Sequence, residues 1–232
     1  MSGGAGDRER AEELLLARIS ATAGRARLGR RHATYRALPT VPGGRWTATA
    51  DVRRLLGAGG GPATRAAARL DLYEHGMTFA VGRRIHVIRF DTTVVRRRKV
   101  LSARGITRAL VLVDVDGERV VLRCGDFGRW QEWWPAIRRA VVAAQTPRAL
   151  AALHQGARLA FGPVWLTADE VGCGATVLGW SRVRRIDVLN GFVAVRADGR
   201  WQVWATAASG IPNLCVFQAL AEHLVRAARD GD

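Results

Sequence analysis

The stretch Leu110-Val-Leu-Val-Asp-Val-Asp-Gly-Glu-Arg-Val-Val-Leu122, with the helical segment that follows it, decides the fold. Two runs of β-branched and aliphatic residues flank Asp116-Gly117, and such a dipeptide supplies the positive φ angles of a tight hairpin turn. After residue 129 the apolar residues recur at helical spacing and form one stripe: Trp130, Trp134, Ile137 and Val141. The pattern predicts an antiparallel hairpin closed by an amphipathic helix.

The same order of patterns occurs a second time, after an interval of about 80 residues. The second copy contains Phe192-Val-Ala-Val195, the turn Asp198-Gly199, Trp201-Gln-Val-Trp204, and a helix with Phe217, Leu220 and Leu224. Residues 72–90 and 159–180 also resemble each other, with Met77 matched to Val164 and Phe90 to Trp180. A unit of this length is too long for a solenoid repeat and indicates a duplicated small domain.

The duplication predicts an α+β fold, mainly β, with two tandem units that each end in an amphipathic helix. We expect an N-terminal helix, extended segments and a glycine-rich linker over residues 1–69, a first domain over 70–145, a connecting helix over 146–157 and a second domain over 158–232. The connecting helix is inferred from Thr146-Pro147, a pair typical of a helix start, and from Gly156, a typical stop.

Five strings identify a relative: Leu72-Tyr-Glu-His-Gly76, Arg89-Phe-Asp91, Leu150-Ala-Ala-Leu-His-Gln-Gly156, Phe161-Gly-Pro163 and Ile211-Pro-Asn-Leu214. Together they resemble the strings of a group of tandem pleckstrin-homology-like (PH-like) proteins from GC-rich bacteria, over residues 70–228. The resemblance implies two barrels, each closed by its C-terminal helix. It implies no catalytic residue.

The positive charge of the chain is unevenly distributed. The net charge is +16, and all of the basic residues except Lys99 are arginines. The excess is +8 over residues 1–69, +7 over residues 70–150 and +1 over residues 151–232. Because positive charge attracts polyanions, we expect any anionic partner to meet the first two thirds of the chain.

Six basic residues are candidate anion ligands: Arg83, Arg84, Arg96, Arg97, Arg98 and Lys99. The run over residues 96–99 continues a strand, where a solvated strand end is the ordinary outcome and an anion-contacting loop is the functional alternative. In phosphoinositide-binding relatives, basic residues cluster on the loop after the first strand. The resemblance places Gly82-Arg83-Arg84 there in the first unit and the acidic Ala168-Asp169-Glu170 in the second, so we expect only the first unit to bind an anion.

Four further residues are candidates for an interface. Trp201 and Trp204 are three apart on a predicted strand, so their side chains must face opposite sides. Leu214 and Val225 belong to a second apolar strip on the last helix, and a helix that is apolar on two sides is normally covered on two sides. We expect these residues to contact the other unit or a second chain.

The motifs of catalysis and of metal or cofactor binding are missing from the sequence. Residues 57–61 lack the Lys of a phosphate-binding loop, Asp126-Phe-Gly128 lacks the other kinase motifs, and the five His and three Cys show no metal-ligand spacing. We therefore expect no enzyme, no cofactor and no metal. Scattered cysteines, the absence of a signal-peptide pattern and the absence of a long apolar run indicate a cytoplasmic protein without a transmembrane segment.

Three functions compete. The first is a non-enzymatic binding or scaffold protein that contacts a protein partner. The second is peripheral association with anionic lipid at the inner membrane face, through the basic first unit. The third is non-specific nucleic-acid binding, which ranks last because no recognition motif is present.

Overall fold

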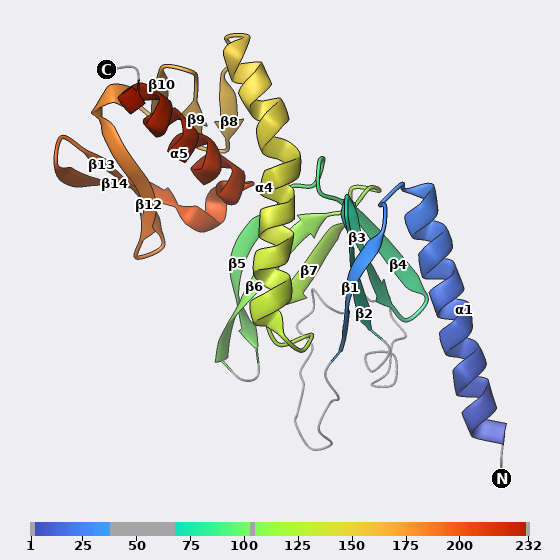
Figure 1. Ribbon diagram of the computed structural model, residues 1–232. Helices are drawn as coiled ribbons and strands as arrows, with labels where there is room; N and C mark the ends of the chain where they lie inside the picture. The colour runs from blue at the N-terminus through green and yellow to red at the C-terminus, as the bar shows by residue number, and fades with distance from the viewer. Residues whose placement is uncertain (1–2, 38–67, 103–104, 231–232) are drawn as a thin grey trace.

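The computed structural model describes residues 3–37, 68–102 and 105–230. Within these residues the fold is α+β and mainly β, with four antiparallel sheets and three α-helices (Figure 1). The predicted α+β, mainly β class is thereby confirmed, whereas the described sheets do not close into the two barrels that the resemblance implies. The possible strand at residues 46–49 and the glycine-rich stretch at 57–62 lie outside the described residues.

In the described residues, the first unit contains seven strands in two sheets, followed by a helix. The strands of the four-stranded sheet lie in chain order: β1 (Arg31–Arg36), β2 (Arg69–Tyr73), β3 (Gly76–Val81) and β4 (Arg84–Arg89). The three-stranded sheet contains β5 (Arg96–Ser102), β6 (Gly105–Val113) and β7 (Arg119–Arg123). The helix α4 (Trp130–His154) follows.

The second unit repeats this order. Its four-stranded sheet contains β8 (Leu159–Phe161), β9 (Val164–Leu166), β10 (Glu170–Cys173) and β11 (Thr176–Gly179). Its three-stranded sheet contains β12 (Val183–Leu189), β13 (Phe192–Ala197) and β14 (Arg200–Ala207), and α5 (Leu214–Asp230) follows. Between β13 and β14, Asp198 and Gly199 both have positive φ angles, 51° and 79°, as a two-residue hairpin turn requires.

The first unit begins earlier than residue 70, where the sequence analysis placed it. β1 pairs with β2 in antiparallel register, from Arg31 opposite Tyr73 to Arg36 opposite Arg69. Counted from β1, Met77 lies in the third strand of its unit, whereas Val164 lies in the second strand of the other. The match between these two residues was therefore wrong by one strand. Phe90 and Trp180 do occupy equivalent places, directly after the fourth strand of each unit.

The connecting helix predicted at residues 146–157 is not a separate element. α4 runs without a break from Trp130 to His154, with Pro135 and Pro147 inside it. A proline inside a helix removes a hydrogen bond, but the Ala- and Leu-rich sequence on either side favours the helix strongly. The second half of α4 also packs Leu153 into the core, where its side chain is 1% exposed. A single helix thus spans both units (Figure 1).

The apolar face of α4 differs by one residue from the predicted stripe. Trp133, Ile137 and Val141 are fully buried, whereas Trp134 is half-buried and Trp130 is exposed at 36%. Trp133 makes an edge-on ring contact with Phe127, with 6.3 Å between the ring centroids. Trp130 is the first residue of α4, so no preceding helical turn holds its side chain against the sheet.

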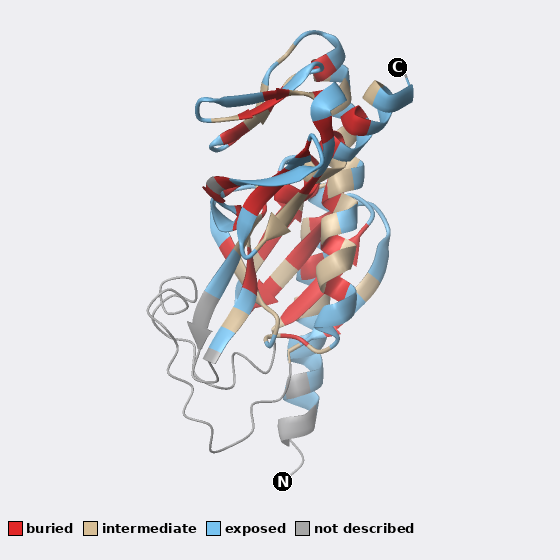
Figure 2. Ribbon diagram, turned by 90° about the vertical axis from the view of Figure 1, so that its left-hand side faces the viewer, coloured by how far each residue is buried: buried red, intermediate tan, exposed pale blue. Residues whose placement is uncertain are grey.

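The cores of the two units form one contiguous cluster, which reaches from Tyr35 in β1 to Val225 in α5. α4 and α5 pack against each other at the junction. Figure 2 shows the buried residues along the strands and along the inner faces of the helices, while exposed residues mark the turns. The packing therefore joins the two units through a shared core.

A polar network reinforces the junction. The side chain of Gln145 in α4 donates to the carbonyl oxygens of Phe90 (2.8 Å) and Thr93 (2.9 Å). Asn213, at the start of α5, donates its Nδ2 to Gln145 Oε1 (2.9 Å) and accepts from the N–H of Val95 at its Oδ1 (2.6 Å). The loop between β4 and β5 is therefore tied to both helices.

The N-terminal helix α1 (Gly3–Arg25) packs against β3 and β4 on the outside of the first unit. Its buried contacts come from its C-terminal part, where Ile19 is fully buried and Ala23 joins a small cluster with Leu28, Tyr73 and Val87. Leu14, nearer the middle of the helix, is 65% exposed. None of the helices in the described part of the chain is long and apolar enough to cross a membrane.

Candidate functional site

The six predicted anion ligands fall into two groups with different neighbours. Arg83 and Arg84 lie at the turn from β3 to β4, where Arg84 Nη1 is 3.4 Å from Glu118 Oε2 and the carbonyl of Arg83 accepts from Arg18. The other four lie on β5, in the other sheet, and Figure 1 shows β4 and β5 on opposite sides of α4. The fold does not bring the six residues together.

The comparison of loops made from the sequence was also wrong. The turn with Arg83 follows the third strand of its unit, not the first, because both β1 and β2 precede β3. Asp169 and Glu170 follow the second strand of the other unit, so the two loops are not equivalent. The turn equivalent to Arg83 contains Gly174, between β10 and β11.

The four residues on β5 have different environments. Arg96 donates to the carbonyl of Gly210 in the second unit (3.0 Å), so it belongs to the junction. Arg97 is half-buried, and its pKa is lowered chiefly by burial and further by the nearby cations Arg138 and Arg108. Arg98 and Lys99 are exposed. Only the last two are therefore fully open to an anion in solution.

Of the four interface candidates, three are already covered within the chain. Trp204 (5% exposed), Leu214 (4%) and Val225 (6%) are buried. Trp201 is 40% exposed, so the two tryptophans face opposite sides of their strand, as expected. Among these four, Trp201 is the one that a partner could reach.

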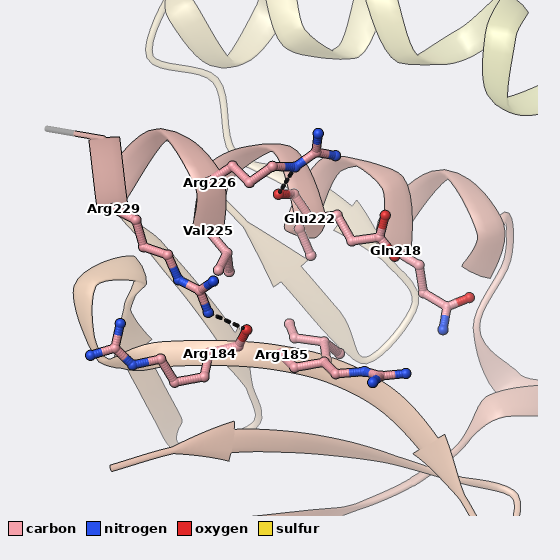
Figure 3. A pocket seen from close by; sticks show the side chains of 9 residues that line it. Arg184, Arg185, Gln218, Glu222, Val225, Arg226 and Arg229 are labelled. Atoms are coloured by element: carbon pink, nitrogen blue, oxygen red, sulfur yellow. Dashed lines mark hydrogen bonds between the residues drawn. The ribbon is translucent and has the colours of Figure 1, made fainter. Parts of the chain in front are cut away.

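The second unit contains a groove between α5 and the edge strand β12, with a volume of about 330 Å³. Ile186, Ala221 and Val225 are buried and supply its apolar floor. Its rim carries four exposed arginines, Arg184 and Arg185 from β12 and Arg226 and Arg229 from α5, together with Gln218 and Glu222 (Figure 3). The rim therefore carries four cations and one carboxylate.

Local backbone geometry explains why these arginines gather. The β12–β13 register shifts between Val183 and Arg185, which indicates a bulge at Arg184 and lets two consecutive arginines both be exposed. On α5, Arg226 and Arg229 are three residues apart and share one side of the helix. Arg229 donates from Nη2 across the groove to the carbonyl of Arg184 (2.9 Å, Figure 3).

Within the described residues, the hydrogen bonds of these arginines use few of their donors. Arg226 Nε donates to the carbonyl of Glu222 (3.2 Å), and Arg185 Nη2 lies 2.7 Å from Asp187 Oδ2. A guanidinium carries five N–H donors in a fixed planar arrangement that matches a carboxylate or a phosphate. The groove can therefore accept an acidic group at its rim and an apolar side chain at its floor.

Sequence reasoning missed this groove because the net charge of residues 151–232 is close to zero. The fold separates the charges: Asp169 and Glu170 lie at the β9–β10 turn, and Asp198 pairs with Arg182 at 2.6 Å. The available signal was the Arg184-Arg185 pair together with Arg226 and Arg229 at helical spacing on the last helix.

Residues in the five strings that carry the sequence resemblance stabilise the fold. Arg89 and Asp91 form a two-bond ion pair, with both N–O distances at 3.0 Å, and this pairing lowers the pKa of Asp91. Asn213 holds the junction network described above. A Cβ on Gly76 would overlap the carbonyl oxygen of Ile88, so this position needs glycine.

Fold and groove together define a two-unit α+β protein with a basic groove beside its last helix. The model of a family of unknown function (DUF6585) matches residues 63–230, and the chain belongs to this family. The match begins after β1, which lies outside it. No curated protein and no solved structure matches the chain.

Proposed function

We propose that this chain is a non-enzymatic binding protein built from two tandem PH-like domains. The support is the element order, in which a four-stranded and a three-stranded antiparallel sheet are followed by a helix, twice in one chain. The proposal also rests on the resemblance of the five sequence strings. A cytoplasmic location, with a bacterial origin, is part of the same proposal.

The partner is a protein that presents an extended acidic segment to the α5–β12 groove. The observation that carries this proposal is the combination of an edge strand, an apolar floor and a lining that includes four arginines, of which Arg229 reaches across to β12 (Figure 3). An extended segment alternates its side chains between two sides. Acidic residues can then face the arginines while apolar residues enter the groove, so charge and shape select the same ligand.

The test uses a short fluorescein-labelled peptide in which Glu and Val alternate, with fluorescence anisotropy as the readout. We expect the full chain to bind it, and Arg185→Glu with Arg226→Glu to weaken binding at least tenfold because two attractive charges become repulsive. Raised salt is expected to weaken binding to the unmodified chain as well, since the rim is exposed.

The matched control is Arg119→Glu with Arg139→Glu. Both residues are exposed, on β7 and α4 of the first unit, so this variant has the same net charge change outside the groove. Its affinity is expected to stay within about twofold of the unmodified chain, because surface charges that far from the ligand are screened. Equal weakening by both variants, or equal binding of a peptide in which Lys replaces Glu, would contradict the proposal.

Peripheral association with an anionic membrane is a second candidate, favoured by the β5–β6 hairpin. Arg98, Lys99 and Arg108 are exposed along it, and Ile106 near its end is 73% exposed. In Figure 1 the hairpin extends away from the second unit. Basic residues around an exposed apolar side chain suit the interface of an anionic bilayer.

For this candidate we expect the Arg98→Ser, Lys99→Ser, Arg108→Ser variant to bind phosphatidylserine-containing vesicles about a hundredfold more weakly, since each basic group contributes on the order of 1 kcal/mol. Co-sedimentation measures the binding. Replacing Arg139, Arg196 and Arg200 with Ser removes the same charge from scattered exposed sites and is expected to cost less than tenfold. Equal binding to neutral vesicles would contradict membrane association, and tight duplex-DNA binding without vesicle binding would favour the nucleic-acid alternative.

A further inference from the structure

Three side chains with metal-ligand chemistry meet on the first unit. His86 lies on β4, while Asp114 and Glu118 lie at the two ends of the turn from β6 to β7. His86 Nδ1 is 2.8 Å from Asp114 Oδ2 and 3.8 Å from Glu118 Oε2, and the three atoms all lie within 4.8 Å of one another. The residues come from both sheets of the unit.

The backbone fixes the carboxylate of Asp114 in place. Its Oδ1 accepts from the N–H groups of Asp116 (3.0 Å) and Glu118 (2.7 Å), which leaves Oδ2 to face His86. The turn is also bonded to β4, since the N–H of Val115 donates to the carbonyl of Val87 (2.9 Å). Asp114 is therefore held beside His86 before any ligand arrives.

The imidazole of His86 is also held. It is 7% exposed, and it stacks on Phe79 with 6.1 Å between ring centroids and 19° between ring planes. The Glu118 side chain, in contrast, is 47% exposed, so the site opens to solvent on that side. Arg84 Nη1 is 3.4 Å from Glu118 Oε2, so a cation neighbours the cluster.

We infer that His86 Nδ1, Asp114 Oδ2 and Glu118 Oε2 form a site for a divalent transition-metal cation such as Zn²⁺ or Mn²⁺, with water completing the coordination. One imidazole and two carboxylates are ligands that these ions accept. Tetrahedral ligands at about 2.1 Å from an ion lie roughly 3.4 Å apart. The two distances from His86 Nδ1, 2.8 Å to Asp114 and 3.8 Å to Glu118, bracket that separation. A bound ion would therefore lengthen the first and shorten the second by about half an ångström each.

The sequence predicts no metal site, because its His and Cys residues show no metal-ligand spacing. The cluster escapes that search because His86 and Asp114 are 28 residues apart and come together where the β6–β7 turn bonds to β4. The inference is independent of the proposed groove function, which concerns the second unit.

The test is isothermal titration of the tag-free, chelator-treated full chain with Zn²⁺ and, separately, Mn²⁺. We expect one site, weakened at least tenfold by Glu118→Gln, which removes a charged ligand. Arg84→Gln removes the competing cation and is expected to tighten binding severalfold. Both variants break the same Arg84–Glu118 ion pair, so a purely structural role would change the two variants in the same direction. Opposite changes in affinity identify a metal site.

Controls keep the inference falsifiable. Glu132→Gln removes an exposed carboxylate that pairs with Arg129 (2.7 Å) on the same unit, and it is expected to leave the affinity unchanged. Thermal melting of each apo variant verifies that the chain is folded. The inference fails if neither ion binds to the unmodified chain. It also fails if the Glu118→Gln and His86→Gln variants both bind the ion as tightly as the unmodified chain does, because other side chains then hold it.

Discussion

Replacing Trp133 with Ala is expected to lower the free energy of unfolding by about 3–5 kcal/mol, because a fully buried aromatic side chain is removed from a packed core. Its side chain is 0% exposed and contacts the rings of Phe127 and Trp134, with centroid distances of 6.3 and 6.1 Å. Urea unfolding followed by far-UV circular dichroism measures the loss, provided that the transition is two-state.

The neighbouring tryptophans supply matched controls on the same helix. Trp130→Ala removes a side chain that is 36% exposed, and it is expected to cost about 1 kcal/mol or less. Trp134, which is half-buried against the core, should give an intermediate loss. A loss from Trp134→Ala that equals or exceeds the loss from Trp133→Ala would show that the helix presents the other face to the sheets.

The expected order of these three stability losses depends on which face of α4 is buried. Spacing along the helix predicts that an apolar face exists but does not fix its exact rotation. The predicted stripe and the observed buried face share Ile137 and Val141. Trp133 and Trp134 lie four and three residues before Ile137, so helical spacing allows either of them on that face. The choice between them depends on how the helix sits on the sheets. Arg129, with a left-handed φ of 60°, sets where α4 begins and therefore its rotation, and no composition rule anticipates that angle.

The strands were predictable where turn dipeptides mark them. Asn190-Gly191 and Asp198-Gly199 define the hairpins of the last sheet, and all four residues have positive φ. β1 was harder to place, because it precedes β2 by more than 30 residues and has no turn signal that links the two. Missing it as the first strand displaced the repeat alignment, and with it the expected equivalence of the basic and acidic loops.

Neither candidate site could be predicted from local sequence. The groove depends on a bulge at Arg184 and on α5 lying beside an edge strand. The metal cluster depends on the β6–β7 turn reaching β4. Both are consequences of pairing between distant segments, whereas net charge and motif spacing describe only neighbours along the chain.

Replacing Asn213 with Ala is expected to lower the free energy of unfolding by about 2–4 kcal/mol. The substitution leaves the N–H of the buried Val95 without the acceptor that lies 2.6 Å away, which costs about 1–3 kcal/mol. It also places alanine at a φ of 48°, in the left-handed region, which alanine disfavours by about 1 kcal/mol. Calorimetric melting is the measurement.

Asn213→Gly separates the two contributions, because glycine adopts a positive φ without strain but cannot bond to Val95 or Gln145. We expect it to lose less stability than the alanine variant, by about 1 kcal/mol. Since Asn213 and Gln145 join α4, α5 and the β4–β5 loop, we also expect either variant to broaden the single transition or split it into two. A sharp transition in both variants, with losses below about 1 kcal/mol, would show that apolar packing between α4 and α5 holds the units together without this network.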